Sequence, residues 1–166
     1  MRHAKSSWSD SSLSDFERPL NERGRRAAPF MGELIVREGL LPDHVVSSPS
    51  KRTKETVELV VIASEYTGDI CFDSRIFEAT VGELMEVLVD LPDTAERALV
   101  VGHNPASEQI VQTLTGAMEA MPTAALAVID LKVDSWANIA PGSGELKRFF
   151  RPRDEARRVH GVDEGK

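Results

Sequence analysis

Two of the four histidines in this chain stand where a side chain can take part in chemistry. His103 directly follows the short apolar run 98–102 and precedes Asn104-Pro105, where a new helix is expected to begin. Ligands of open α/β sheets bind beyond the carboxyl ends of the strands, so this position favours a site. The alternative is a histidine that only makes a hydrogen bond within a turn. His3 lies so near the start that, taken alone, it is equally compatible with an unstructured end.

A second group of residues suits the binding of an anion. Residues 47–53 (SSPSKRT), which include Ser48 and Arg52, follow an expected strand and open an expected helix. The free N–H groups and dipole of a helix N-terminus attract anions, and an arginine adds a planar fork of donors. Arg18 stands just ahead of Asn21, the expected cap of an earlier helix. For each arginine the plain alternative is a solvated side chain.

The composition narrows the class of partner. The formal net charge is −7, and the sequence pI is about 5.1. Nucleic-acid binding needs a broad basic surface, so no nucleic acid is expected, whereas a few converging arginines still allow an anionic substrate. Cys71 is the only cysteine, no apolar run has the length of a membrane span, and the first residues lack a signal peptide. We therefore expect a cytoplasmic monomer without membrane attachment.

Alternating apolar segments predict one α/β domain over residues 1–152. Strands are expected at 44–47, 70–72, 98–102, 124–131 and 144–150, and helices at 22–38, 50–66, 81–91 and 106–114. Segment 98–102 is apolar throughout, as in a strand buried on both faces. The fold class that follows is a three-layer α/β/α sandwich with a mostly parallel central sheet. Residues 153–166 are charged and poor in apolar residues, which predicts a solvated tail.

The start of the chain departs from this scheme. A buried strand should lead into Arg2-His3, yet only Met1 precedes them. Either the sheet lacks this strand or the true start lies upstream. We expect the second, because loss of a central strand leaves its neighbours' edges unpaired.

Four strings make the pattern specific: RHAKSSW at 2–8, RPLNERG at 18–24, SSPSKRTKET at 47–56 and VVGHNP at 100–105. In order and separation they resemble the histidine phosphatase superfamily, and in particular its SixA-type phosphohistidine phosphatases. The resemblance runs from Arg2 to about Gly116 and continues more loosely to Pro152. It implies a phosphoglycerate-mutase-like fold.

The resemblance also implies a set of roles. His3 would be the nucleophile that forms a phosphohistidine intermediate, which water then hydrolyses. In phosphoryl transfer the protein mainly positions the reacting groups in line and stabilises the negative charge on the equatorial oxygens. The side chains implied to supply these, directly or by binding substrate, are Arg2, Arg18, Asn21, Ser48, Arg52 and His103, with His103 expected as a cation. The resemblance requires no metal and no cofactor.

The general acid is less clear from the sequence. Glu78 is the first candidate, because it lies between the third expected strand and the next helix, and the wider superfamily uses a carboxylic acid to protonate an oxygen leaving group. Asp10 and Asp15 are alternatives near the nucleophile, and any of the 27 acidic residues can simply be a surface charge. A phosphohistidine substrate lessens the need for a strong acid, since its P–N bond cleaves readily.

The leading hypothesis is a phosphatase acting on phosphohistidine of a protein. The segment from Lys51 to His103 is already allotted to helices and strands, which leaves no room for the lid of superfamily members that hydrolyse small phosphate esters. An open site suits a phosphorylated side chain but also admits small esters, so hydrolysis of those is the first alternative. The second is a catalytically silent phosphate-binding module.

Overall fold

The computed structural model describes residues 1–160 and contains two groups of strands. Strands β1 (His44–Ser47), β2 (Ile70–Phe72) and β3 (Ala98–Val101) form a parallel sheet in the order β2-β1-β3. Strands β4 (Leu126–Leu131) and β5 (Gly144–Phe150) form an antiparallel pair. All five segments were expected to be strands, because each is a short apolar or alternating run bounded by turn residues.

Residues 1–3 lie between these two groups and connect them. Arg2 forms a parallel bridge with Gly102, directly after β3. On the other side, the backbone N–H of Ala124 donates to the carbonyl oxygen of His3 at 3.0 Å. His3, the nucleophile expected from the sequence, therefore lies in an ordered segment that is hydrogen-bonded on both sides.

The amino group of Met1 takes part in the same arrangement. It donates to the carbonyl oxygen of Val100 at 2.7 Å, and burial of this group lowers its pKa to about 5. The expectation that a longer strand leads into Arg2 and His3 stays a prediction.

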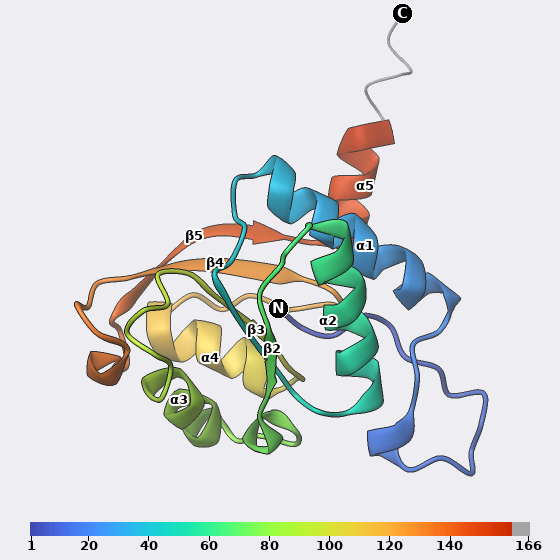
Figure 1. Cartoon of the computed structure of the whole chain (residues 1–166), viewed down its shortest axis with the longest axis horizontal. Coiled ribbons are helices and arrows are strands. Elements are labelled where there is room, and N and C mark those ends of the chain that lie inside the picture. The colour runs from blue at the N-terminus through green and yellow to red at the C-terminus, as the bar shows by residue number, and fades with distance from the viewer. Residues whose placement is uncertain (161–166) are drawn as a thin grey trace, which may run out of the picture.

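Helices cover both faces of the sheet (Figure 1). On one face α1 (Glu22–Arg37) packs against α2 (Lys51–Ala63). On the other, α3 (Val81–Val89) packs against α4 (Ala106–Thr115). Among the helices of residues 1–160, none combines the length and apolar character needed to cross a bilayer.

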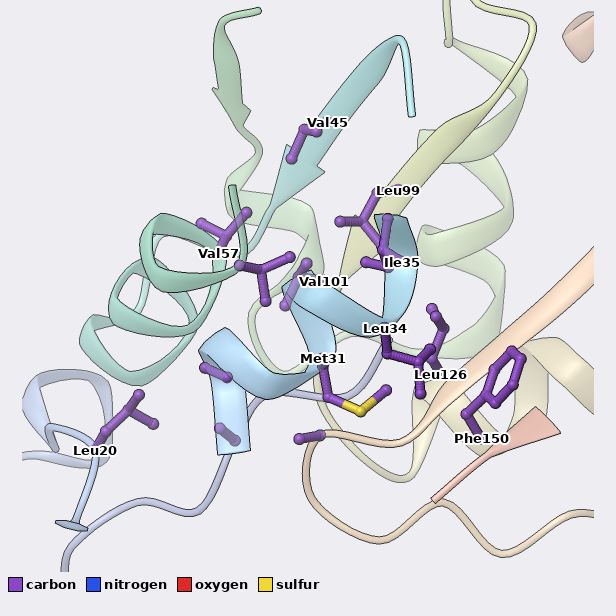
Figure 2. Packing of buried hydrophobic residues seen from close by; sticks show 14 residues of the cluster. Leu20, Met31, Leu34, Ile35, Val45, Val57, Leu99, Val101, Leu126 and Phe150 are labelled. Carbon is purple, nitrogen blue, oxygen red and sulfur yellow. The ribbon is translucent and has the colours of Figure 1, made fainter. Parts of the chain in front are cut away.

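The core shows why three layers form. Neighbouring strand residues point to opposite faces, so Val45 and Val46 bury their side chains in different clusters. Val45 belongs to the cluster that includes Leu34 of α1 and Val57 of α2 (Figure 2). Val46 belongs to the cluster with Leu84 of α3. The predicted three-layer α/β/α sandwich is confirmed.

The helix ends that matter for the site follow local capping rules. The Oδ1 atom of Asn21 accepts from the N–H of Gly24 at 2.9 Å and so caps α1, as the sequence indicated. Ser50 is the N-cap residue of α2 but makes no side-chain capping bond. Helix α2 ends at Ala63 and not near Tyr66, because the chain turns at Glu65, whose φ is 56°.

The expected solvated tail is a helix over its described part. Residues Pro152–His160 form α5, which lies beside α1 (Figure 1). Glu155 is buried and accepts a hydrogen bond from Arg158 at 2.9 Å, while Arg37 of α1 lies 3.9 Å away. A scarcity of apolar residues pointed to a tail, whereas this part is helical and the ion pair between Arg37 and Glu155 joins it to α1. Residues 161–166 lie outside the described part of the chain.

Candidate active site

The carboxyl ends of the parallel elements bring the predicted histidines together. His3 follows the bridge residue Arg2, Ser48 follows β1, and His103 follows β3. Parallel strands end at the same edge of a sheet, and the rings of His3 and His103 accordingly lie 5.1 Å apart, centroid to centroid. Both side chains are 7% exposed.

One ring nitrogen of His3 is unprotonated. Its Nδ1 lies 2.7 Å from the carbonyl oxygen of Ala4, which can only accept, so Nδ1 carries the proton and Nε2 does not. Burial lowers the pKa of His3 to about 4, and the positive charges of Arg52, Arg2 and Arg18 act in the same direction. The ring is therefore neutral near pH 7, and Nε2 keeps the lone pair that a nucleophile needs.

His103 is held in the opposite tautomer. Its Nδ1 lies 3.2 Å from Nη2 of Arg52, which can only donate, so Nε2 carries the proton and donates to Oγ of Ser48 at 2.9 Å. Burial lowers the pKa of His103 to about 3, with further lowering from His3 and Arg52. Two buried imidazoles and an arginine that share one enclosed space favour the neutral form of His103. The expectation that His103 is a cation next to a bound phosphoryl group stays a prediction.

Arg52 lies at the centre of the site, in the first turn of α2. It is 6% exposed, and its Nε donates to Nε2 of His3 at 3.3 Å while Nη2 reaches His103. Its remaining donors reach Asp15: Nη1 bonds to the backbone oxygen and Nη2 lies 2.8 Å from Oδ2. One guanidinium thus contacts both histidines and a carboxylate.

Arg18 joins the site through the same carboxylate. Its Nη1 lies 2.7 Å from Oδ1 of Asp15, so the two oxygens of Asp15 bridge Arg18 and Arg52. The guanidinium is fixed by Oγ of Ser6 at 2.7 Å and lies over the ring of Trp8. Partial burial alone would raise the pKa of Asp15, but the hydrogen bonds from the two arginines outweigh it and hold that pKa below its usual range.

Arg2 is the third arginine of the site and directly precedes His3 in the chain. Its Nη1 donates to the carbonyl oxygen of Met121 at 2.7 Å, and Nε is buried without a hydrogen-bond partner in the described residues. Burial lowers the pKa of Arg2; the negative charge of Glu108 opposes this shift, and the positive charge of Arg52 adds to it. An unpaired buried donor next to a nucleophile suits an anion, because leaving it unsatisfied is costly.

Three predicted residues take different places. Ser48 is fully buried and accepts from His103, so it positions that ring and has no direct access to substrate. Asn21 uses its amide oxygen to cap α1. Glu78 is exposed, with a left-handed φ of 53°, and follows Phe77, whose ring meets that of His103 edge-on at 5.6 Å.

Sequence reasoning did not single out two contacts. Phe77 packs against both His103 and Phe16, and so connects the loop before α3 to the loop before α1. The hydroxyl of Thr56 accepts from the backbone N–H of Ala4 at 3.0 Å and thereby fixes the chain next to His3. Thr56 lies within the string SSPSKRTKET, so its place in a specific motif was the available signal.

The comparison with known families decides the assignment. The description of the histidine phosphatase superfamily (branch 1) matches residues 1–90, which include His3, Arg18 and Arg52. The chain belongs to the histidine phosphatase superfamily. An uncharacterized protein of Mycobacterium tuberculosis is 29% identical over 164 residues, covering 92% of this chain and 100% of the relative.

Solved structures agree with this membership of the histidine phosphatase superfamily. A protein of Agrobacterium tumefaciens assigned as a phosphohistidine phosphatase SixA is 25% identical, with a TM-score of 0.78 over 92% of this chain and 95% of that one. A protein histidine phosphatase SixA in complex with tungstate has a TM-score of 0.80 at 21% identity, over 93% and 96% of the two chains. At 21% identity, the likeness to the tungstate complex shows a shared fold.

Proposed function

We propose that this protein is a phosphatase that transfers a phosphoryl group to Nε2 of His3 and releases it to water. The proposal rests on the tautomer of His3: its Nε2 has a lone pair, which faces the guanidinium of Arg52. A nucleophile next to preorganised donors is the arrangement that phosphoryl transfer requires.

The surrounding donors support the same reaction. Arg52 and Arg18 are both nearly buried, and both present planar forks that match the oxygens of a phosphoryl group. His103 faces His3 across the same space, with its tautomer fixed by Ser48. Removal of one such donor typically costs about 3–4 kcal/mol of transition-state stabilisation.

The proposed substrate is phosphohistidine on a protein. Two aromatic residues of the loop before α1 are exposed beside the site: Trp8 is 73% exposed and Phe16 is 39% exposed. An open rim with exposed aromatic rings suits contact with the surface of another protein. The structural likeness to SixA proteins supports this substrate class.

The experiment compares turnover of a histidine-phosphorylated protein with that of p-nitrophenyl phosphate and of sugar phosphates, each with the unaltered protein and with His3→Ala. We expect kcat/KM to be highest for the phosphohistidine protein and every activity to vanish in His3→Ala. Better turnover of sugar phosphates would replace the substrate by a small ester. Undiminished activity in His3→Ala would refute the mechanism.

A further inference from the structure

Asp15 holds the two arginines that are expected to bind the phosphoryl group. Its carboxylate spans Nη1 of Arg18 at 2.7 Å and Nη2 of Arg52 at 2.8 Å. A bound phosphoryl group needs donors from the same guanidinium groups. The carboxylate of Asp15 and the substrate therefore compete for the same hydrogen bonds.

The backbone of Asp15 stays at the site when its carboxylate gives way. The carbonyl oxygen of this residue accepts from Nη1 of Arg52, independently of the carboxylate. The side chain is 45% exposed, so it has room to rotate toward the open side. Arg52 is at the same time within hydrogen-bond distance of His3. A carboxyl group displaced from the arginines thus remains close to Arg52 and, through it, to His3, on the solvent-exposed side of the site.

Displacement also changes the chemistry of this carboxyl group. Asp15 is surrounded by the positive charges of Arg18 and Arg52 on the side of the site, and the neutral rings of His3 and His103 lie behind them. A phosphoryl dianion neutralises those charges and adds a negative charge nearby. Both effects favour the protonated form of a carboxyl group. Substrate binding therefore prepares an acid at the place where the leaving group departs.

We propose, on the basis of the phosphatase function proposed above, that Asp15 is the general acid and base of this site. In the first step Nε2 of His3 forms the N–P bond while the P–O or P–N bond to the leaving group breaks. The proton of Asp15 moves to the leaving oxygen or nitrogen. In the second step water attacks phosphorus, its proton passes to the carboxylate of Asp15, and the N–P bond breaks.

Glu78 is the competing candidate, and its surroundings differ. Glu78 is exposed, and the arginine of its own loop, Arg75, bonds to Asp73 and Asp90. The carboxylate of Asp15, by contrast, contacts Arg18 and Arg52 directly. Asp10 offers a matched control, because it is an exposed aspartate in the same loop. Its carboxylate accepts from Ser12, away from the arginines.

The experiment uses two aryl phosphates that differ in their need for an acid. The p-nitrophenolate ion leaves without a proton, whereas phenol requires one. In Asp15→Asn we expect kcat/KM for phenyl phosphate to fall about 100-fold or more, and that for p-nitrophenyl phosphate to fall less than about 10-fold. In Asp10→Asn both values are expected to stay unchanged.

The possible outcomes distinguish failure of the role of Asp15 from failure of the phosphatase function. An equal loss for both substrates in Asp15→Asn would assign Asp15 to positioning of the arginines and overturn its role as acid. A selective loss for phenyl phosphate in Glu78→Gln, with Asp15→Asn unaffected, would transfer the role to Glu78. In both cases activity of the unaltered protein keeps the phosphatase function intact. An unaltered protein that hydrolyses neither ester and no phosphohistidine would overturn both proposals together.

Discussion

The protonated Nε2 of His103 donates to Oγ of Ser48 at 2.9 Å, while the opposite nitrogen of the same ring accepts from Arg52. Ser48 itself is fully buried. The hydroxyl therefore fixes the orientation and tautomer of His103, which makes Ser48 a positioning residue.

Replacement of Ser48 by alanine tests this role. We expect Ser48→Ala to lower kcat about 10-fold, because one neutral hydrogen bond of about 1–1.5 kcal/mol is lost, while KM changes little. Steady-state kinetics on p-nitrophenyl phosphate measures both. Ser12→Ala, at an exposed hydroxyl bonded to Asp10, is the control and should match the unaltered protein. A raised KM at unchanged kcat would instead make Ser48 a substrate-binding residue.

The buried His3 makes stability depend on pH. Its pKa is lowered from 6.5 to about 4 in the folded protein, so the folded state binds fewer protons than the unfolded state between these values. The stabilisation is complete above pH 6.5 and is lost as the pH falls toward 4. Urea unfolding at about pH 7 and about pH 4.5 should show a loss on the order of 2–3 kcal/mol from this residue.

His3→Gln isolates that contribution. Glutamine has no proton to gain in this range, so the variant should lose less stability than the unaltered protein over the same interval. The amino group of Met1, whose pKa is also lowered, is present in both proteins, so its effect cancels. In the variant His103 lacks the influence of His3 that lowers its pKa, which further reduces the loss of stability. Equal losses in the two proteins would mean that His3 is not buried as a neutral ring.

Gly24 permits the close approach of α1 to the segment after His3. A Cβ atom at this position would overlap the backbone carbonyl oxygen of Lys5. We expect Gly24→Ala to lower the free energy of unfolding by about 1–3 kcal/mol, because backbone cannot move aside as a side chain does.

Gly82→Ala is the matched control for that substitution. Gly82 also lies in a helix, but it is exposed, and its nearest neighbour is Oγ1 of Thr80 at 3.8 Å. There alanine should leave stability unchanged or raise it by about 0.5–1 kcal/mol. Urea denaturation measures both, and equal behaviour of the two variants would contradict the close packing at Gly24.

Much of the site was predictable because it depends on strand ends. His103 follows an apolar strand, and the parallel arrangement forces it to the same edge as the end of β1. Arg52 was predictable from its place at a helix N-terminus and in a specific motif. The role of His3 could be predicted only from the family resemblance. Only Met1 precedes Arg2, so no strand pattern leads into this residue.

The remaining contacts depend on how loops fold back, which local patterns do not encode. The bridge from Asp15 to Arg52 joins residues 37 positions apart, and the contact between Phe16 and Phe77 joins two separate loops. The helical state of Pro152–His160 was missed for a similar reason: its buried residue is Glu155, whose partners come in part from α1. Ion pairs with distant residues leave no apolar periodicity to read.

The most direct measurement is the capture of a phosphoryl group on the protein. The chain is mixed with a radiolabelled phosphohistidine donor, quenched within the first turnover, and divided between acid and alkali. We expect label that survives alkali, is lost in acid, and maps by mass spectrometry to His3, with none in His3→Ala. Label on another residue, or hydrolysis without any captured phosphoryl group on His3 even when turnover is slowed, would contradict nucleophilic attack by this histidine.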